Sequence, residues 1–242
     1  MIKTIVIFIY LVTAMLTLAP VGILVVLLSM AGLRRPMSAF MYCIARAWAL
    51  LLLKYIGCKL TVSGVENIPR KDSGGVCFVS NHGSIFDVVL LLAYAGRPFG
   101  FIAKKELLMI PMLNMWISVL GGLFIDRKNP RKALKTINTG VTRLKRGWGM
   151  VIFPEGHRSR GKGLLPFHPG SLKLATQSGS AIVPVALAGT YEIFEKNRRV
   201  IPGPVSITFC KPINTADIPP TDRKMILTEQ IFNTIKEALE NQ

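Results

Sequence analysis

A histidine and an aspartate stand five positions apart at the end of an apolar run, in the segment VSNHGSIFDVV (79–89). A carboxylate that binds one imidazole nitrogen fixes the tautomer of the ring and raises the basicity of the other nitrogen. Oriented in this way by Asp87, His82 would take a proton from a hydroxyl group. The sequence has no Gly-x-Ser-x-Gly motif that would mark a serine nucleophile. The pair therefore predicts a general base that activates a hydroxyl of the substrate, without a covalent enzyme intermediate.

A structural role competes with this catalytic interpretation. Ser84 followed three residues later by Asp87 is a capping-box pattern, which predicts a helix that begins at Ile85. In this interpretation Asp87 caps the helix and His82 is only a turn residue. The two roles are compatible, because His82 precedes the cap and the turn can bring its ring back over the first helical turn.

A second polar cluster follows the apolar segment GGLFIDR (121–127). Its last residue, Arg127, has a guanidinium group that could bind a phosphate in two places. Eight positive charges and no acid lie between Arg127 and Arg146. An apolar stripe in the same stretch predicts a helix whose charges mostly face solvent; it consists of Leu134, Ile137, Val141 and Leu144.

A third cluster lies in VIFPEGHRSRGKG (151–163), where Glu155, a flexible Gly156 and Arg158 follow an apolar run. This composition predicts a loop that binds an anionic ligand. The other two histidines are not expected to act in catalysis. His157 is expected to be a polar residue of the loop without a specific role, and His168, which precedes a Pro-Gly turn, is expected to be structural.

The same segment imitates a nucleotide-binding loop, with Gly156-x4-Gly161-Lys162. Gly163 stands where that motif needs a serine or threonine for magnesium, and prolines follow where a helix should begin, so nucleoside triphosphate chemistry is excluded. No His/Glu arrangement suggests zinc. The sequence therefore predicts neither a metal nor a cofactor.

The elements that must position these clusters alternate between strands and helices from Lys59 onward. Strands are expected at 59–64, 75–80, 99–103, 122–126, 149–153, 181–187 and 205–210. Helices are expected at 85–95, at 104–120 with an interruption at Pro111, and at 130–146, 169–178 and 222–240. This alternation predicts an α/β fold with a mixed, largely parallel sheet flanked by helices. The three clusters follow strands, and functional residues of such sheets collect at the carboxyl ends of the strands.

The first 57 residues have a different composition, and we expect residues 1–57 to anchor the catalytic domain at 58–242 to a membrane. No charged side chain occurs from Ile5 to Leu33, a run longer than the roughly 20 residues that span a bilayer. Pro20 interrupts the run, which leaves either one kinked span or two short helices that enter one leaflet and return. Residues 37–57 predict a basic amphipathic helix that lies on a membrane surface or packs over the domain.

Composition supports an anionic membrane as a partner. Lys and Arg outnumber Asp and Glu by 30 to 13, which gives a formal charge of +17, and the mean hydropathy is +0.43. Nucleic acid is excluded as a partner, because aromatic residues are not interleaved with the basic ones. Arg34 and Arg35 after the apolar run predict that the catalytic domain lies on the cytoplasmic side of the cell membrane. The four cysteines are scattered and fit a reducing compartment.

Four segments in the same order resemble the 1-acylglycerol-3-phosphate acyltransferase family over roughly residues 75–190. They are NHGSIFD, GGLFIDR, FPEGHRS and IVPVAL. The first contains the His-x4-Asp motif of that family. His157 departs from the pattern, because the family usually has threonine there.

The resemblance implies transfer of an acyl group from a thioester to the sn-2 hydroxyl of lysophosphatidic acid, which gives phosphatidic acid. The thioester would be an acyl-carrier-protein or an acyl-CoA. By the resemblance, His82 is the general base, Asp87 orients it, and the phosphate is held by Arg127, Glu155, Gly156 and Arg158. Other acceptors, such as glycerol 3-phosphate or another lysophospholipid, remain alternatives, as does a non-catalytic membrane-bound binder of anionic lipid.

Overall fold

The computed structural model describes residues 2–214 and 223–242. In these residues seven strands form one sheet, in the order β1-β7-β6-β2-β5-β3-β4. The strands are β1 (Lys59–Ser63), β2 (Val76–Ser80), β3 (Phe99–Lys104), β4 (Leu123–Ile125), β5 (Gly149–Ile152), β6 (Ala181–Ala188) and β7 (Pro204–Phe209). Every neighbouring pair is parallel except β6 and β7. The predicted mixed, largely parallel sheet is confirmed, and each predicted strand is present.

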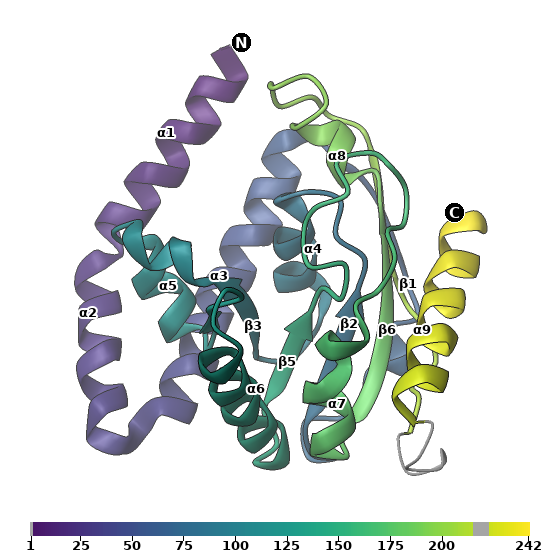
Figure 1. Ribbon diagram of the computed structural model, residues 1–242. Helices are drawn as coiled ribbons and strands as arrows, with labels where there is room; N and C mark the ends of the chain where they lie inside the picture. The colour runs from purple at the N-terminus through teal and green to yellow at the C-terminus, as the bar shows by residue number, and fades with distance from the viewer. Residues whose placement is uncertain (1, 215–222) are drawn as a thin grey trace.

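Helices cover both faces of the sheet (Figure 1). One face packs against α3 (Arg34–Ile56) and α4 (Phe86–Tyr94), and the other against α6 (Pro130–Lys145), α7 (Lys173–Ser178) and α9 (Arg223–Glu240). The central strand β2 is buried along its whole length. Its side chains alternate between the two cores: Phe78 points into the first, and Cys77 and Val79 into the second.

Helix boundaries follow the sequence prediction closely. The stretch 104–120 divides at Pro111 into a 3-10 turn (Lys105–Met109) and α5 (Leu113–Val119). The stretch 169–178 is a 3-10 turn (Pro169–Leu172) followed by α7, and a short unpredicted α8 (Thr190–Ile193) follows β6. The predicted start of the last helix at residue 222 lies outside the described residues.

The N-terminal segment forms α1 (Ile2–Thr17) and α2 (Ala19–Leu28), followed by a π-turn (Ser29–Leu33). Pro20 lies in the first turn of α2, where its missing amide hydrogen costs little. The two helices continue in one general direction along the side of the molecule opposite α9, and the chain reverses only after α2 (Figure 1). Gly32 has φ 94° there, a conformation that favours glycine. Of the two arrangements predicted at Pro20, the helix pair that returns there is therefore wrong in the position of its turn.

Helix α3 packs over the domain, which was one of its two predicted positions. Leu52, Leu53 and Ile56 are buried in the same core as α4 and the sheet, whereas Leu51 and Tyr55 are exposed. A smaller core joins α2 to the rest of the chain: Val25 of α2 packs with Met41 of α3 and Val119 of α5.

Candidate active site

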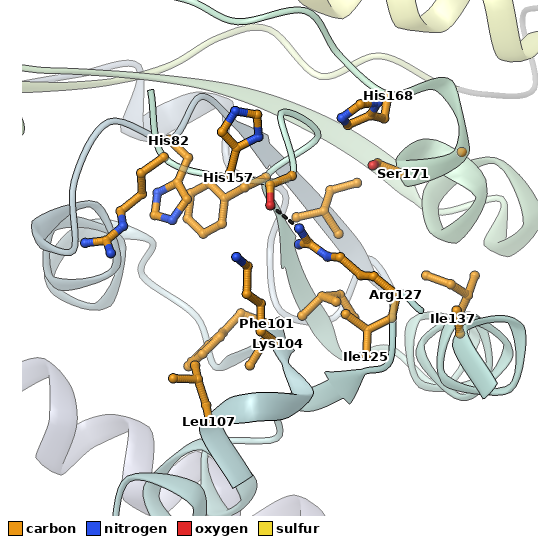
Figure 2. A pocket seen from close by; sticks show the side chains of 18 of the residues that line it. His82, Phe101, Lys104, Leu107, Ile125, Arg127, Ile137, His157, His168 and Ser171 are labelled. Atoms are coloured by element: carbon orange, nitrogen blue, oxygen red, sulfur yellow. Dashed lines mark hydrogen bonds between the residues drawn. The ribbon is translucent and has the colours of Figure 1, made fainter. Parts of the chain in front are cut away.

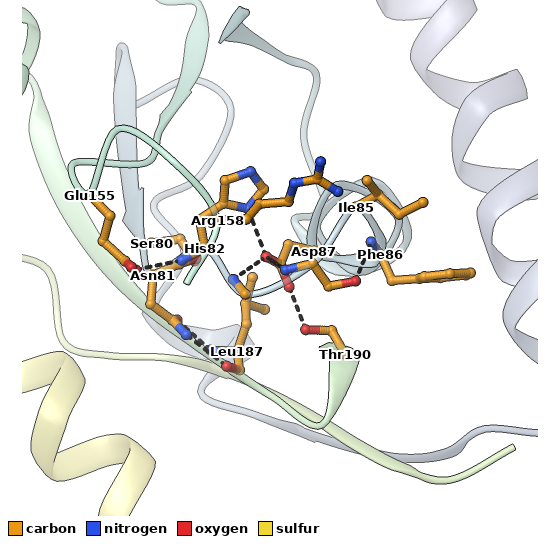
Figure 3. A network of polar contacts seen from close by, with 12 residues as sticks. Ser80, Asn81, His82, Ile85, Phe86, Asp87, Glu155, Arg158, Leu187 and Thr190 are labelled. Atoms are coloured by element: carbon orange, nitrogen blue, oxygen red, sulfur yellow. Dashed lines mark hydrogen bonds and ion pairs between the residues drawn. The ribbon is translucent and has the colours of Figure 1, made fainter. Parts of the chain in front are cut away.

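The predicted pair meets where the loop after β2, which contains His82, leads into the first turn of α4, which contains Asp87 (Figure 3). His82 Nδ1 lies 2.8 Å from Asp87 Oδ2. The same oxygen accepts the backbone amides of Gly83 at 2.8 Å and Ser84 at 2.9 Å, and Oδ1 accepts the Thr190 hydroxyl at 2.6 Å. Asp87 is fully buried. A carboxylate held in this way favours the tautomer with hydrogen on Nδ1, which leaves Nε2 of His82 as the free base.

The imidazole of His82 is also fixed from other directions. Its ring stacks on Phe153, with centroids 4.0 Å apart and planes 19° apart. Its backbone amide donates to Glu155 Oε1 at 2.7 Å, and its carbonyl accepts the Ser159 amide at 2.7 Å. The side chain is 18% exposed, so the ring is accessible while its orientation is fixed.

The capping interpretation holds together with this geometry. Asp87 accepts the Ser84 amide, as a capping box requires, but the Ser84 hydroxyl accepts the Phe86 amide at 3.0 Å instead of that of Asp87. Helix α4 begins at Phe86, one residue later than predicted. One carboxylate therefore both orients the imidazole and closes the start of the helix.

A cavity of about 890 Å³ opens beside His82 (Figure 2). Its polar end is lined by His82, Arg127, Gly156 and Arg158. Its remaining wall is mostly apolar and includes Phe101, Leu107, Leu113, Ile117, Ile125, Leu134 and Ile137. The volume is in the range of sites for small organic ligands, and the polarity is divided between a cationic end and an apolar arm. The cavity thus fits an anionic amphiphile.

Three of the predicted phosphate-binding residues lie together at the polar end. The Arg127 guanidinium donates through Nη1 to the carbonyl oxygen of Gly156 (Figure 2). Gly156 has φ 76°, a conformation that favours glycine, and a Cβ there would also make a tight contact of 3.2 Å with the ring of His168. Arg158 extends from the same loop and pairs with Glu195 at 3.2 Å.

The structure places Glu155 away from the cavity that the other three predicted phosphate-binding residues line. It is 1% exposed and does not line the cavity. Its carboxylate oxygens accept the amides of His82 at 2.7 Å and Leu165 at 3.3 Å. Burial raises the pKa of Glu155 to about 7, although these two hydrogen bonds act in the opposite direction. Glu155 joins the third cluster to the backbone of the catalytic histidine candidate.

Sequence reasoning missed several residues of the site. Lys104 lines the cavity at the end of β3. Functional residues collect at the carboxyl ends of strands, and this criterion, which predicted Arg127, also applies to Lys104. Thr190 and Glu195 had no such signal, because they reach Asp87 and Ser84 across 103 and 111 positions of the chain. His157 and His168, which the sequence did not predict as site residues, both line the cavity.

The fold and the site together define an α/β protein with an oriented imidazole beside a cavity lined by both cationic and apolar side chains. The family model Acyltransferase matches residues 59–188, and the chain belongs to that family. The resemblance found in the four sequence segments is confirmed.

Individual relatives agree with the family. A 1-acyl-sn-glycerol-3-phosphate acyltransferase of Borreliella burgdorferi is 36% identical over 152 residues, which cover 63% of this chain and 60% of the relative. The chloroplastic 1-acyl-sn-glycerol-3-phosphate acyltransferase of Arabidopsis thaliana is 34% identical over 177 residues, covering 72% of this chain and 49% of the relative. The chain thus spans only about half to three fifths of the length of these relatives. The crystal structure of the 1-acyl-sn-glycerophosphate acyltransferase PlsC from Thermotoga maritima superposes with a TM-score of 0.77 at 25% identity, over 99% of this chain and 96% of that one.

Proposed function

We propose that the protein transfers an acyl group from a thioester donor to the sn-2 hydroxyl of lysophosphatidic acid and releases phosphatidic acid. The observation that carries this proposal is that His82 lines one cavity together with Arg127, Arg158 and a largely apolar wall. A lysophosphatidic acid combines a phosphate, an acyl chain and a reactive hydroxyl between them. The names of the relatives support the same reaction.

In the proposed mechanism, Nε2 of His82 takes the proton of the sn-2 hydroxyl while the hydroxyl oxygen attacks the thioester carbonyl. The tetrahedral intermediate collapses with cleavage of the C–S bond, and the imidazolium returns the proton to the departing sulfur. Asp87 stays ionised throughout, holds the Nδ1 hydrogen and stabilises the positive charge that forms on the ring. No residue of the protein becomes acylated.

Arg127 and Arg158 bind the acceptor phosphate in this proposal, and the backbone of Gly156 allows close approach. Lys104 supports them, since its amine and the Arg127 guanidinium point into the same part of the cavity as His82 (Figure 2). Guanidinium groups bind phosphate oxygens in pairs, which would fix the distance from the phosphate to the reacting hydroxyl.

We also propose that α1 and α2 lie in one leaflet of the membrane. One helix in the described residues, Ala19–Ile56, is long and apolar enough to cross a membrane by length and composition. It contains the reversal at Gly32, and its second half is α3, which packs in the core of the domain.

Contacts of α1 argue further against a span. The Val200 amide donates to Thr4 Oγ1 at 2.9 Å, and the rings of Phe8 and Phe194 are 5.5 Å apart. A helix that is covered by a globular domain along one side cannot cross a bilayer without drawing that domain into the lipid. Large exposed apolar side chains that suit lipid contact lie on the other side of α1 and on α2; they are Ile2, Ile5, Ile9, Val12 and Leu16 of α1, and Ile23, Leu24 and Leu27 of α2.

The reaction is tested with purified protein in mixed vesicles, each acceptor being offered with acyl-CoA and with acyl-carrier-protein. We expect release of free thiol that depends on lysophosphatidic acid and is much slower with glycerol 3-phosphate or lysophosphatidylcholine. Equal or faster release with another acceptor would reassign the substrate. Binding of lysophosphatidic acid without any thiol release from either donor would favour a non-catalytic lipid binder.

A further inference from the structure

Glu195, in the segment after α8, contacts both halves of the candidate site. Its Oε1 accepts the Ile85 amide at 2.8 Å and pairs with Arg158 Nη1 at 3.2 Å. Its Oε2 accepts the Ser84 hydroxyl at 2.6 Å. The side chain is only 14% exposed, so the contacts form in a partly desolvated position. One carboxylate thus joins the arginine of the anion-binding loop to the first turn of α4.

Arg158 depends on this contact for its orientation. In the described part of the chain its guanidinium pairs only with Glu195, through Nη1, which leaves Nε and Nη2 available to a phosphate. Arg158 lines the cavity together with His82 and Ile85, and it lies over the start of α4 in Figure 3. An unrestrained arginine has many rotamers, and fixing it before the ligand arrives lowers the entropic cost of binding.

The other contacts of Glu195 act on the catalytic pair. The first amides of a helix have no partner within the helix, and Glu195 satisfies that of Ile85. Ser84, which Glu195 binds through the hydroxyl, donates its own amide to Asp87. The turn that places Asp87 under His82 is therefore held from the same carboxylate that holds Arg158.

We propose that Glu195 is a positioning residue that fixes Arg158 of the phosphate site relative to the His82–Asp87 pair. The inference rests on the proposed function. The negative charge of Glu195 also repels a phosphate on Arg158, so removal of the residue has two opposing effects on acceptor binding: loss of orientation and loss of repulsion.

Two substitutions separate these effects, because both remove the charge and only one removes the contacts. In Glu195→Gln, the amide oxygen can still accept from Ile85 and Arg158, and the amide nitrogen can donate to the Ser84 hydroxyl. Glu195→Ala loses all three contacts. The difference between the two variants therefore isolates the positioning effect.

The experiment measures kcat and the apparent KM of each substrate for both variants, in the wild-type and Arg158→Ala backgrounds. We expect the KM for lysophosphatidic acid to be roughly 3- to 10-fold higher in Glu195→Ala than in Glu195→Gln, as for one lost hydrogen bond. The donor KM should be the same in both. In the Arg158→Ala background, the difference in acceptor KM between Glu195→Ala and Glu195→Gln should disappear. Any lower kcat of Glu195→Ala should persist there, because it arises through the contacts of Glu195 at the start of α4. Glu192→Gln is the matched control, since Glu192 pairs with Lys196 on the surface of the same segment, and it should behave as wild type.

Equal acceptor KM values for the alanine and glutamine variants would overturn the proposal, as would a difference that survives in the Arg158→Ala background. If thermal melting shows that Glu195→Ala does not fold, Glu195→Asp replaces it: the charge is kept but the shorter side chain cannot reach Arg158, so its acceptor KM should exceed that of the wild type. A wild-type protein that transfers nothing to lysophosphatidic acid would refute the proposed function itself, whereas an active wild type with either of the first two results would refute only the role of Glu195.

Discussion

Asp87 accepts hydrogen bonds from four donors: the His82 ring, the amides of Gly83 and Ser84, and the Thr190 hydroxyl. Substitution by asparagine can preserve much of this geometry, because Oδ1 can face the first three donors while Nδ2 donates to Thr190. The substitution removes only the charge that stabilises a protonated His82.

We therefore expect Asp87→Asn to lower kcat by roughly 10³- to 10⁴-fold with little change in melting temperature. His82→Ala should abolish transfer and leave the fold and membrane binding intact. Both are checked by thiol release with thermal melting in parallel. Turnover of His82→Ala near the wild-type rate would refute the mechanism.

The raised pKa of Glu155 predicts a particular dependence of stability on pH. Its folded pKa of about 7 lies above the ordinary value of 4.5, so the folded protein binds a proton that the unfolded chain has already lost. The contribution of Glu155 to the free energy of unfolding is complete below pH 4.5 and is lost as the pH rises to about 7. Glu155→Gln should remove this component, so that the difference in stability between wild type and variant changes with pH only in this window. Urea unfolding at a series of pH values checks this, and a pH-independent difference would contradict it.

At the scale of elements, Arg127 and its loop were predictable because polar residues at the carboxyl ends of parallel strands meet at one edge of the sheet. Arg127→Ala should raise the apparent KM for lysophosphatidic acid about 10- to 150-fold, the loss expected for one charge-assisted contact, and should change the donor KM much less. Steady-state kinetics with each substrate varied in turn measures the acceptor KM and the donor KM separately. A change confined to the donor KM would assign Arg127 to the carrier instead.

The sequence predicted each strand because each is a short apolar run bounded by polar or turn residues. It did not predict where the N-terminal segment reverses. Proline is the stronger sequence signal for a helix break, so Pro20 was the expected position. Gly32 lies in an apolar run, and no neighbouring residue type indicates that its φ is positive. The contacts of Glu195 with Ser84 and Arg158 were also inaccessible, since only the folded sheet brings the segment after β6 over the start of α4.

Gly32 itself gives a test at this scale. A Cβ at this position would meet no atom within 4 Å, so an alanine there has room and pays only for its left-handed backbone. Gly32→Ala should therefore lower the free energy of unfolding by about 1–2 kcal/mol. Gly203→Ala is the control, because a Cβ there would make only ordinary contact with Ile193, at 3.8 Å, and its φ is not positive. Equal stability of both variants would show that the reversal is not held in the left-handed conformation.

At the scale of the whole molecule, the proposed reaction joins a lipid acceptor to a donor that arrives from water, which requires the cavity to lie near the level of the lipid headgroups. Helices α1 and α2 run along one side of the molecule (Figure 1). Helix α1 packs through Ile7 in the larger core, and α2 shares a small core with α3 and α5, which ties the depth of the cavity to the depth of the helices. The formal charge of +17 adds attraction to anionic headgroups.

The one-leaflet arrangement predicts that Ile2, which is 80% exposed, lies on the same side of the bilayer as the catalytic domain. In sealed vesicles that display this domain outward, a cysteine in place of Ile2 should not react with a membrane-impermeant maleimide trapped in the lumen. Cys43, Cys58 and Cys210 are replaced for this experiment, whereas Cys77 can stay, because it is fully buried and burial raises the pKa of its thiol. Asp72→Cys serves as the marker of the outer side, since the Asp72 side chain is 76% exposed. Labelling of residue 2 from the lumen, with Asp72→Cys labelled only from outside, would show that α1 and α2 cross the membrane and would rule out the one-leaflet arrangement.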